Sequence, residues 1–431
     1  MSKNKDTIYA LSTPAGKSAI ALIRISGSDS LKVLKKISLI KKIIPNKTNI
    51  TFLKYKKLTI DQVVVIYFKK PNSFTGEEMV EISCHGSPAI IVKISKTLQD
   101  LGIRLAEPGE FTRRSLLNDK IDLLQTESLA DLINAETEKQ RSLAVSGLSG
   151  ELNAFINKIK DELKLILANT EALIDFADED LPKNILKKIT EQNKNIIKKI
   201  HSEINNSKIS KPIRDGFVVS VVGKPNTGKS SFVNYVSKKE VSIVTNIPGT
   251  TTDTVTSIID IDGYKFTFVD TAGLRKHKNK IEEIGIKKAE EIIKKSNINL
   301  VFLEKNEHAQ YRNIKNKIFI RSKLDKRRKK NKEKNTVNIS SFTGEGVKAL
   351  LKKLNKKLIG SQKNEPILSR ERHIYIMKRV LSELKSIKPN ESLDIQAFKY
   401  REALRLSLEI NNKFDIEDVL DIIFRDFCIG K

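Results

Sequence analysis

Residues 223–230 read Gly223-Lys224-Pro225-Asn226-Thr227-Gly228-Lys229-Ser230, the pattern G-x-x-x-x-G-K-S, and this stretch decides the fold of the middle of the chain. The apolar run at 217–222 predicts a buried parallel strand before it, and residues 230–237 predict a helix after it. A glycine-rich turn in that position directs backbone N–H groups and the positive end of a helix dipole at a phosphate. We expect Lys229 to reach the β- and γ-phosphates of a nucleotide and Ser230 to ligate Mg²⁺. A chance glycine-rich turn is the alternative, and the flanking strand and helix argue against it.

Further strands alternate with helical segments after this loop. They are predicted at 264–269, 300–303, 317–321 and 336–339. Such alternation is typical of a parallel sheet, so residues 211–360 are predicted to form an α/β nucleotide domain. The flanking segments, 119–210 and 361–431, have the apolar period of helices, with breaks near 147–150 and at Pro182. The simplest arrangement is one helical domain into which the nucleotide domain is inserted.

Residues 1–118 are predicted to form a separate α+β domain. Strands are expected at 19–25, 62–68 and 79–84, and a helix at 88–101. The predicted fold class is therefore multidomain α/β, with an N-terminal α+β domain, a helical domain and an inserted P-loop domain.

Composition limits where the protein works and what it binds. The chain lacks an apolar run of eighteen residues, an apolar secretory segment and a disulfide framework, so a cytoplasmic protein without a membrane span is expected. It has 79 Lys and Arg against 52 Asp and Glu, a formal net charge of +27. This excess favours an RNA partner, or it reflects compositional drift, because it is spread along the chain. The basic segment 321–335 is most simply a solvated loop, with RNA contact as the alternative.

A second nucleotide element, Asp270-Thr271-Ala272-Gly273, follows the strand at 264–269. Asp270 can reach Mg²⁺ directly or through water, and the Gly273 N–H can sense a γ-phosphate. A switch loop lies between the two elements, and one of its threonine hydroxyls is expected to complete the Mg²⁺ shell when the γ-phosphate is present. Its residues are Thr245, Asn246, Ile247, Pro248, Gly249, Thr250, Thr251, Thr252 and Asp253.

Base recognition is predicted at Ser322-Lys323-Leu324-Asp325, where the usual pattern is Asn-Lys-x-Asp. Asp325 can accept from the guanine N1–H and exocyclic amine, and Lys323 can lie along the base, so GTP is selected over ATP. Ser322 replaces the usual Asn, which we expect to weaken nucleotide binding by about 1–2 kcal/mol. Ser340 and Ser341 follow the last strand and are placed to support the guanine O6 through the backbone.

Several longer stretches match a known family over nearly the whole chain. They are DTIYALSTPAG, LIRISG, NSFTGEEMVEISCHG, PGEFTRRSLLNDKIDLLQTESLADLI, GKPNTGKSS, VTNIPGTTTD, DTAGLR, EEIGI and the terminal FCIGK. On these stretches the chain resembles the MnmE family of tRNA-modifying GTPases, also called TrmE. Two residues depart from the family pattern: Ser322, and Thr252, which stands where the family has Arg in G-T-T-R-D.

The resemblance implies a folate-binding-like N-terminal domain that mediates dimerisation. It implies a site for 5-formyl- or methylene-tetrahydrofolate at Arg24, Glu81 and Lys120, which the terminal Lys431 approaches. Lysine and arginine suit the folate carboxylates, and a glutamate suits the pterin edge. Without the family, Arg24 would be a surface ion pair, Glu81 a turn-supporting carboxylate and Lys120 a surface lysine at the start of a helix.

In the nucleotide domain the resemblance implies cation sites and a catalytic carboxylate. The K⁺ ligands are Asn226, Thr245, Ile247 and Thr250, and the Mg²⁺ ligands are Ser230 and Thr251. Leu274 stands where many GTPases carry a water-positioning glutamine, so a carboxylate further along, Glu282 or Glu283, is the candidate for that role. The resemblance implies that Glu282 orients the attacking water. Expected catalytic residues are Glu282, Lys229, Asp270 and Cys428. Expected nucleotide contacts are Asn226, Thr227, Gly228, Lys229, Ser230, Ser231, residues 245–251, Asp270, Thr271, Ala272, Gly273, Ser322, Lys323, Asp325, Ser340 and Ser341.

The two cysteines lead to different expectations. Cys428 matches the near-terminal cysteine of the family, which is implicated in the modification chemistry, whereas a lone cysteine is most often inert packing. Cys84 and His85 are adjacent on a predicted strand and point to opposite faces, so we interpret both as structural. The five histidines are scattered, so no zinc site is expected.

The predicted function is that of a homodimeric, K⁺-dependent GTPase. With an FAD-dependent partner resembling MnmG, in a heterotetramer, it would form the 5-carboxymethylaminomethyl (cmnm5) group at the wobble uridine of certain tRNAs. One alternative is a ribosome-assembly GTPase that binds rRNA. Another is a decayed GTPase that acts as a folate-binding scaffold, an idea motivated by Ser322 and Thr252.

Overall fold

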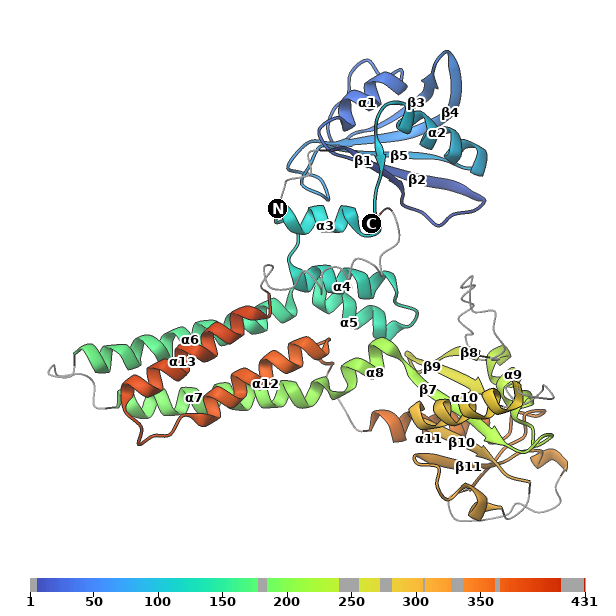
Figure 1. Ribbon diagram of the computed structural model, residues 1–431, viewed down its shortest axis with the longest axis vertical. Coiled ribbons are helices and arrows are strands. Elements are labelled where there is room, and N and C mark those ends of the chain that lie inside the picture. Colours follow the sequence, from blue (N-terminus) through green and yellow to red (C-terminus); the bar gives the residue numbers. More distant parts are fainter. Residues whose placement is uncertain are drawn as a thin grey trace. The chain divides into compact units, whose positions relative to one another are not determined.

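The computed structural model describes residues 6–176, 184–239, 256–271, 281–304, 307–326, 336–360, 365–411 and 430. The chain divides into two compact units, Met1–Ala130 with Leu408–Lys431, and Asp131–Ser407. Each unit contains a six-stranded sheet (Figure 1). Within the described residues, no helix is both long and apolar enough to cross a membrane. The finer division into domains 1–118, 119–210, 211–360 and 361–431 stays a prediction.

The first unit is built on a sheet with the strand order β3-β4-β5-β2-β1-β6. Its strands are β1 (Ile8–Leu11), β2 (Ser18–Ser26), β3 (Thr48–Tyr55), β4 (Leu58–Phe68), β5 (Met79–Gly86) and β6 (Arg104–Leu105). Pairing is antiparallel except between β1 and β6. Helices α1 (Ser30–Ile37) and α2 (Pro88–Asp100) cover one face, where Leu34 and Leu98 pack against Ile23 in a single apolar core.

The second face of this sheet contacts a different helix. Phe111 of α3 (Glu110–Leu117) packs against Ile8 and Ala10 of β1, which point away from the main core. The strands expected at 19–25, 62–68 and 79–84 and the helix expected at 88–101 are confirmed as β2, β4, β5 and α2. The other three strands and α1 were not predicted.

Long helices form the second unit together with its sheet (Figure 1). They include α5 (Glu138–Leu148), α6 (Glu151–Asp175), α7 (Ile185–Asn206), α12 (Glu371–Ser386) and α13 (Leu393–Glu409), with the short helix α8 (Ser210–Asp215) after α7. Helix α4 (Leu123–Ile133) begins in the first unit and ends in the second. Helices α7 and α12 pack together, and Asn193 Nδ2 donates to the Leu384 carbonyl at 3.3 Å. Because the sheet lies between α8 and α12 in sequence, the nucleotide part is inserted into the helical part, as predicted. The break near 147–150 is confirmed, and Pro182 lies outside the described residues.

The second sheet has the strand order β12-β11-β10-β7-β9-β8. Its strands are β7 (Phe217–Gly223), β8 (Thr256–Ile261), β9 (Tyr264–Asp270), β10 (Ile298–Phe302), β11 (Lys317–Arg321) and β12 (Thr336–Asn338). The helices around it are α9 (Lys229–Lys239), α10 (Ile281–Lys295) and α11 (Val347–Ile359). Phenylalanines from three strands and one helix, including Phe217, Phe232 and Phe302, fill its core.

The five predicted strands pair in parallel, as expected, and a sixth strand that was not predicted lies at one edge of the sheet. β8 pairs antiparallel with β9, while the other pairs are parallel. Asp262 and Gly263 join the two strands with positive φ values of 53° and 84°, the backbone of a two-residue hairpin turn. An Asp-Gly pair between two apolar segments is itself a hairpin signal, so β8 was predictable from the sequence.

Candidate functional site

The phosphate loop joins the end of β7 to the start of α9. Because α9 begins at Lys229, the N–H groups of its first turn lie at the end of this loop. Lys229 Nζ donates to the Lys224 carbonyl at 2.7 Å, and the Thr227 hydroxyl donates to the same carbonyl at 2.8 Å, which closes the loop. Gly228 has a φ of +92°, and a Cβ there would lie 2.7 Å from Ser322 Oγ. Glycine is therefore required at this position by both backbone and space.

The residues expected to approach Mg²⁺ from the two nucleotide motifs meet in the structure. Ser230 Oγ donates to Asp270 Oδ2 at 2.7 Å. β7 and β9 are parallel neighbours whose register pairs Val221 with Asp270, so both motifs leave the same edge of the sheet. A hydroxyl and a carboxylate are hard oxygen donors and fit Mg²⁺. Thr271 turns back into the sheet, where its hydroxyl donates to the Val221 carbonyl at 2.9 Å.

The predicted base-recognition residues gather after β11 and β12. Asp325 lies on a short 3₁₀ turn (Leu324–Lys326), and Ser340 Oγ donates to its Oδ1 at 2.5 Å. This hydrogen bond holds the pKa of the Asp325 carboxyl below its usual range, so an ionised acceptor is available for a guanine edge. The Ser341 hydroxyl is buried and has no hydrogen-bond partner among the described residues.

Two side chains connect the base motif to the phosphate loop. Lys323 Nζ donates to the Asn226 carbonyl at 2.7 Å, so its stem spans the gap between the motifs. The Ser322 hydroxyl donates to the Thr227 carbonyl. The serine thus retains a tether to the phosphate loop, although it cannot make the second bond of an asparagine amide.

The N-terminal sheet brings two of the three expected folate contacts together. Arg24 on β2 and Glu81 on β5 are register partners, and Arg24 Nη2 lies 2.7 Å from Glu81 Oε1. The guanidinium also lies 5.3 Å from the ring centre of Phe74 and 5.7 Å from that of Phe111. Both charged side chains are mostly buried. Lys120 contacts the adjacent loop at Gly76, where its Cγ lies 3.1 Å from the position of an added Cβ.

The end of the chain returns to the same sheet. The Ser12 hydroxyl donates to the Gly430 carbonyl at 2.9 Å, and a Cβ on Gly430 would lie 2.3 Å from the Leu11 carbonyl. β1 pairs Leu11 with Ile23 and the preceding residue with Arg24. The penultimate residue therefore lies at the end of β1, the strand that pairs with the one carrying Arg24.

Comparisons with known proteins match both parts of this architecture. The family model described as the GTP-binding protein TrmE N-terminus matches residues 7–120, and the MnmE helical domain model matches residues 123–428. The tRNA modification GTPase MnmE of Rickettsia bellii is 36% identical, with 99% of this chain and 100% of the relative covered. The chain belongs to the MnmE family of tRNA modification GTPases. The Fervidobacterium nodosum MnmE is 38% identical over 99% of this chain and 98% of its own length, and the Aquifex aeolicus MnmE 36% over 99% and 100%.

Membership of the MnmE family confirms the predicted family, the fold class and the enzyme class, a GTP hydrolase. It does not test the individual site residues, several of which lie outside the described residues. These are Thr245, Asn246, Ile247, Pro248, Gly249, Thr250, Thr251, Thr252, Ala272, Gly273, Cys428 and Lys431, with part of the basic segment, 327–335. Glu282 lies in α10, and Ser231 is exposed on the first turn of α9.

Sequence reasoning missed an ion-pair network in the N-terminal sheet of this MnmE-family chain. Arg114 on α3, which is 6% exposed, lies 2.8 Å from Glu110, 2.9 Å from Asp6 and 3.1 Å from Glu77. Arg104 adds a second cation 2.8 Å from Glu110. Burial alone would raise the pKa of the Glu110 carboxyl, but its arginine partners outweigh burial and hold the pKa below its usual range. The family stretch PGEFTRR contains Glu110 and Arg114, but their pairing with Asp6 and Glu77, far away in the sequence, could not be predicted from it.

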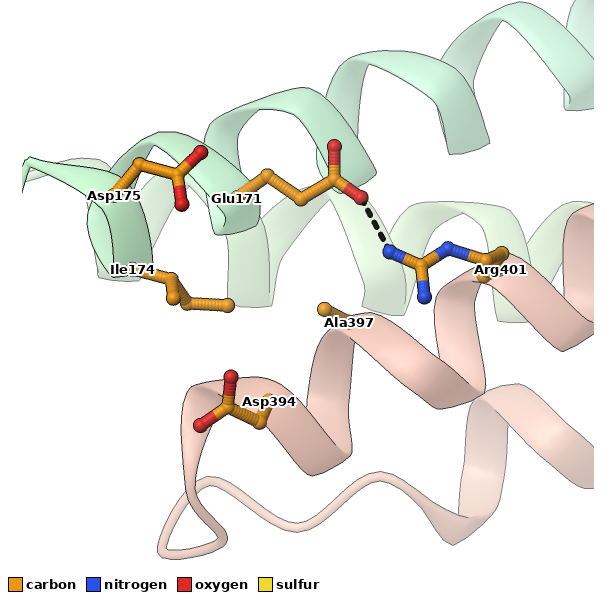
Figure 2. A pocket seen from close by; sticks show the side chains of 6 residues that line it. All are labelled: Glu171, Ile174, Asp175, Asp394, Ala397 and Arg401. Atoms are coloured by element: carbon orange, nitrogen blue, oxygen red, sulfur yellow. Dashed lines mark hydrogen bonds and ion pairs between the residues drawn. The ribbon is translucent and has the colours of Figure 1, made fainter.

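A cavity of about 400 Å³ lies apart from the nucleotide motifs, between the end of α6 and the start of α13 (Figure 2). Its lining side chains are Glu171, Ile174, Asp175, Asp394, Ala397 and Arg401. Arg401 Nη2 donates to Glu171 Oε1 at 2.7 Å across the two helices. This pair ties α6 to α13 in the helical part of the MnmE fold.

Proposed function

We propose that this GTPase works as a cytoplasmic homodimer that requires K⁺ and Mg²⁺. With an FAD-dependent MnmG-like partner, in a heterotetramer, it would form the cmnm5 group at the wobble uridine of certain tRNAs. The observation that carries the proposal is the meeting of Lys229, Ser230 and Asp270 at one sheet edge in a chain of this family. Family membership favours tRNA modification over the alternative of ribosome assembly.

The chain's own residues divide the work of binding GTP. Lys229 and the first turn of α9 bind phosphate oxygens, and Asp325, kept ionised by Ser340, accepts from the guanine edge. Ser230 and Asp270, with Thr251, would hold Mg²⁺, which neutralises phosphate charge when bound. Glu282 is proposed to orient the attacking water.

A potassium site is proposed on the phosphate loop. Asn226 is exposed at a φ of 60° and offers a side-chain carbonyl oxygen, a ligand type that hard cations prefer. Asn226, with Thr245, Ile247 and Thr250, would hold K⁺, which supplies a positive charge against the β- and γ-phosphates as an arginine finger does in other GTPases.

The N-terminal sheet is proposed to bind 5-formyl- or methylene-tetrahydrofolate. Arg24 is held between Glu81 and two aromatic rings, so its guanidinium is oriented before a carboxylate arrives. Glu81, Lys120 and Lys431 are the other proposed contacts, and Cys428 is proposed to act in the modification chemistry. The flavin is assigned to the partner, because the sequence has no dinucleotide-binding fingerprint.

GTP turnover in K⁺ against Na⁺ tests the nucleotide half of the proposal. We expect the wild type to turn over GTP fast in K⁺ and slowly in Na⁺. We expect Asn226→Ala to turn over GTP at the slow Na⁺ rate in both salts. Equal rates in both salts would contradict the potassium site. No turnover in either salt would favour the folate-binding scaffold, the alternative that Ser322 keeps open. Co-purification with the flavoprotein partner tests the assembly.

A further inference from the structure

One aromatic ring beside the base-recognition motif is not among the proposed nucleotide contacts. Phe342 is 89% exposed, the highest value among the large apolar side chains of the described residues. It belongs to the loop that follows β12, two residues after Ser340. Water contact with a whole phenyl ring is unfavourable, and this ring stands in the loop whose Ser340 holds the carboxylate proposed to bind the base, so a base stacked on it would remove that contact.

The loop that carries Phe342 is fixed at several points. The Phe342 N–H donates to Ser340 Oγ at 3.3 Å, and the same hydroxyl donates to Asp325. The Gly344 N–H donates to the Ser340 carbonyl at 2.9 Å, which closes the turn. Gly344 packs on Tyr235 of α9, since a Cβ there would lie 1.9 Å from the Tyr235 hydroxyl oxygen. One hydroxyl therefore connects the exposed ring to the carboxylate that is proposed to read the base.

Recognition of a base by its edge leaves both of its faces uncovered. The hydrogen bonds that Asp325 accepts must lie close to the plane of the guanine ring. A stem such as that of Lys323, which spans from the base motif to the phosphate loop, can pass along one face. The other face needs a flat apolar group, and aromatic rings stack on bases of every kind.

We propose that Phe342 stacks on a face of the guanine base whose edge Asp325 binds, an inference that rests on the proposed guanine site. Stacking is a contribution that a lysine or alanine in this loop could not make to the same degree. Stacking offsets the binding free energy that is lost because Ser322 cannot form the second hydrogen bond of an asparagine. Phe342 is therefore a positioning residue for the nucleotide, and its contribution belongs to the base and not to the phosphates.

The chain contains no tryptophan, so Phe342→Trp introduces a single indole reporter at this point. In the full chain with Mg²⁺ and K⁺, GDP should quench its fluorescence, whereas ribose 5-triphosphate, which has no base, should not. By calorimetry, Phe342→Ala should weaken GDP binding about tenfold and leave ribose 5-triphosphate binding unchanged. Phe398 on α13 is 63% exposed, and Phe398→Trp and Phe398→Ala are the matched controls, expected to show neither effect.

Asp325→Asn separates this inference from the guanine site on which it rests. An amide at this position should weaken GDP and favour the xanthine nucleotide XDP, whose 2-oxo group accepts a hydrogen bond. The stacking is overturned if Asp325→Asn changes the preference from GDP to XDP while Phe342→Ala binds GDP like the wild type and the indole fluorescence does not depend on the base. If Asp325→Asn leaves GDP binding intact, the proposed guanine site itself fails.

Discussion

At the scale of single residues, Ser322 shows how a departure from a motif can retain part of its function. The hydroxyl donates to the Thr227 carbonyl in the phosphate loop. Its Oγ also lies 2.7 Å from the position that a Cβ on Gly228 would take, so a side chain at 322 and a bare glycine at 228 fit one another. The altered base-recognition motif is therefore still hydrogen-bonded to the phosphate loop.

Replacing Ser322 by alanine should weaken GDP binding about fivefold. The change removes a hydrogen bond worth about 1 kcal/mol and leaves the Thr227 carbonyl without this donor. Calorimetric titration measures the effect. Ser237→Ala, which removes a similar serine-to-carbonyl bond on α9, is the matched control and should bind GDP normally. Equal affinity of Ser322→Ala and the wild type would show that the tether does not stabilise the bound state.

Cys84 should be almost inert towards alkylation. Its side chain is buried in the N-terminal core, and burial raises the pKa of its thiol from 9.0 to about 11. The reactive thiolate at pH 8 is therefore about a hundredfold scarcer than in the unfolded chain. Iodoacetamide labelling followed by peptide mapping, with and without urea, measures the difference. Fast labelling of Cys84 in the folded protein would contradict this placement.

At the scale of elements, local patterns were predictable and distant pairings were not. The phosphate loop, β7 and α9 follow from neighbouring residues, because glycine placement and an apolar run determine their conformation. β3 was missed because it is an edge strand with exposed Ile50 and Phe52, so its apolar residues do not identify a buried face.

The candidate site divides in the same way. That Ser230 and Asp270 would approach one ion followed from motif order, because parallel strands end at one sheet edge. The pairing of Arg24 with Glu81 depends on the register of β2 against β5, which no local pattern gives. The exposed ring of Phe342 went unnoticed for a related reason, since exposure is a property of the folded loop.

The network around α3 should make the first unit sensitive to acid. Glu110→Gln leaves two arginines with one carboxylate fewer and should lower the free energy of unfolding by roughly 2–3 kcal/mol at pH 7, because Asp6 and Glu77 remain. Urea denaturation followed by hydrogen exchange of peptides from residues 6–130 measures this. Glu107→Gln, an exposed change nearby, is the control.

The pH dependence follows from the direction of the Glu110 shift. Its pKa in the folded chain lies below the ordinary value of 4.5, so its stabilising contribution is complete above about pH 4.5. That contribution disappears as the pH falls through the folded pKa. The gap in stability between the wild type and Glu110→Gln should therefore narrow below pH 4.5. A gap that stays constant down to pH 3 would show that the ion pairs of Glu110 are not its cause.

At the scale of the whole molecule, a nucleotide domain is inserted into a helical domain, and Gly430 lies beside the N-terminal sheet. Helices from before and after the insertion pack together, as the bond from Asn193 to Leu384 shows. Gly430 returns the terminus to Leu11 and Ser12. We therefore propose that GTP hydrolysis and one-carbon chemistry take place in different parts of one chain and that the first controls the second.

Nucleoside mass spectrometry of tRNA tests this central claim most directly. A strain that lacks the protein is supplied with the wild type, Lys229→Ala or the control Lys353→Ala, an exposed lysine on α11. Lys229 lies at the start of α9, where the lysine of a phosphate loop binds the β- and γ-phosphates, so its loss should abolish phosphate binding and with it the modification. We predict that the wild type and Lys353→Ala restore the modified wobble uridine and that Lys229→Ala does not. Full restoration by Lys229→Ala would contradict the account.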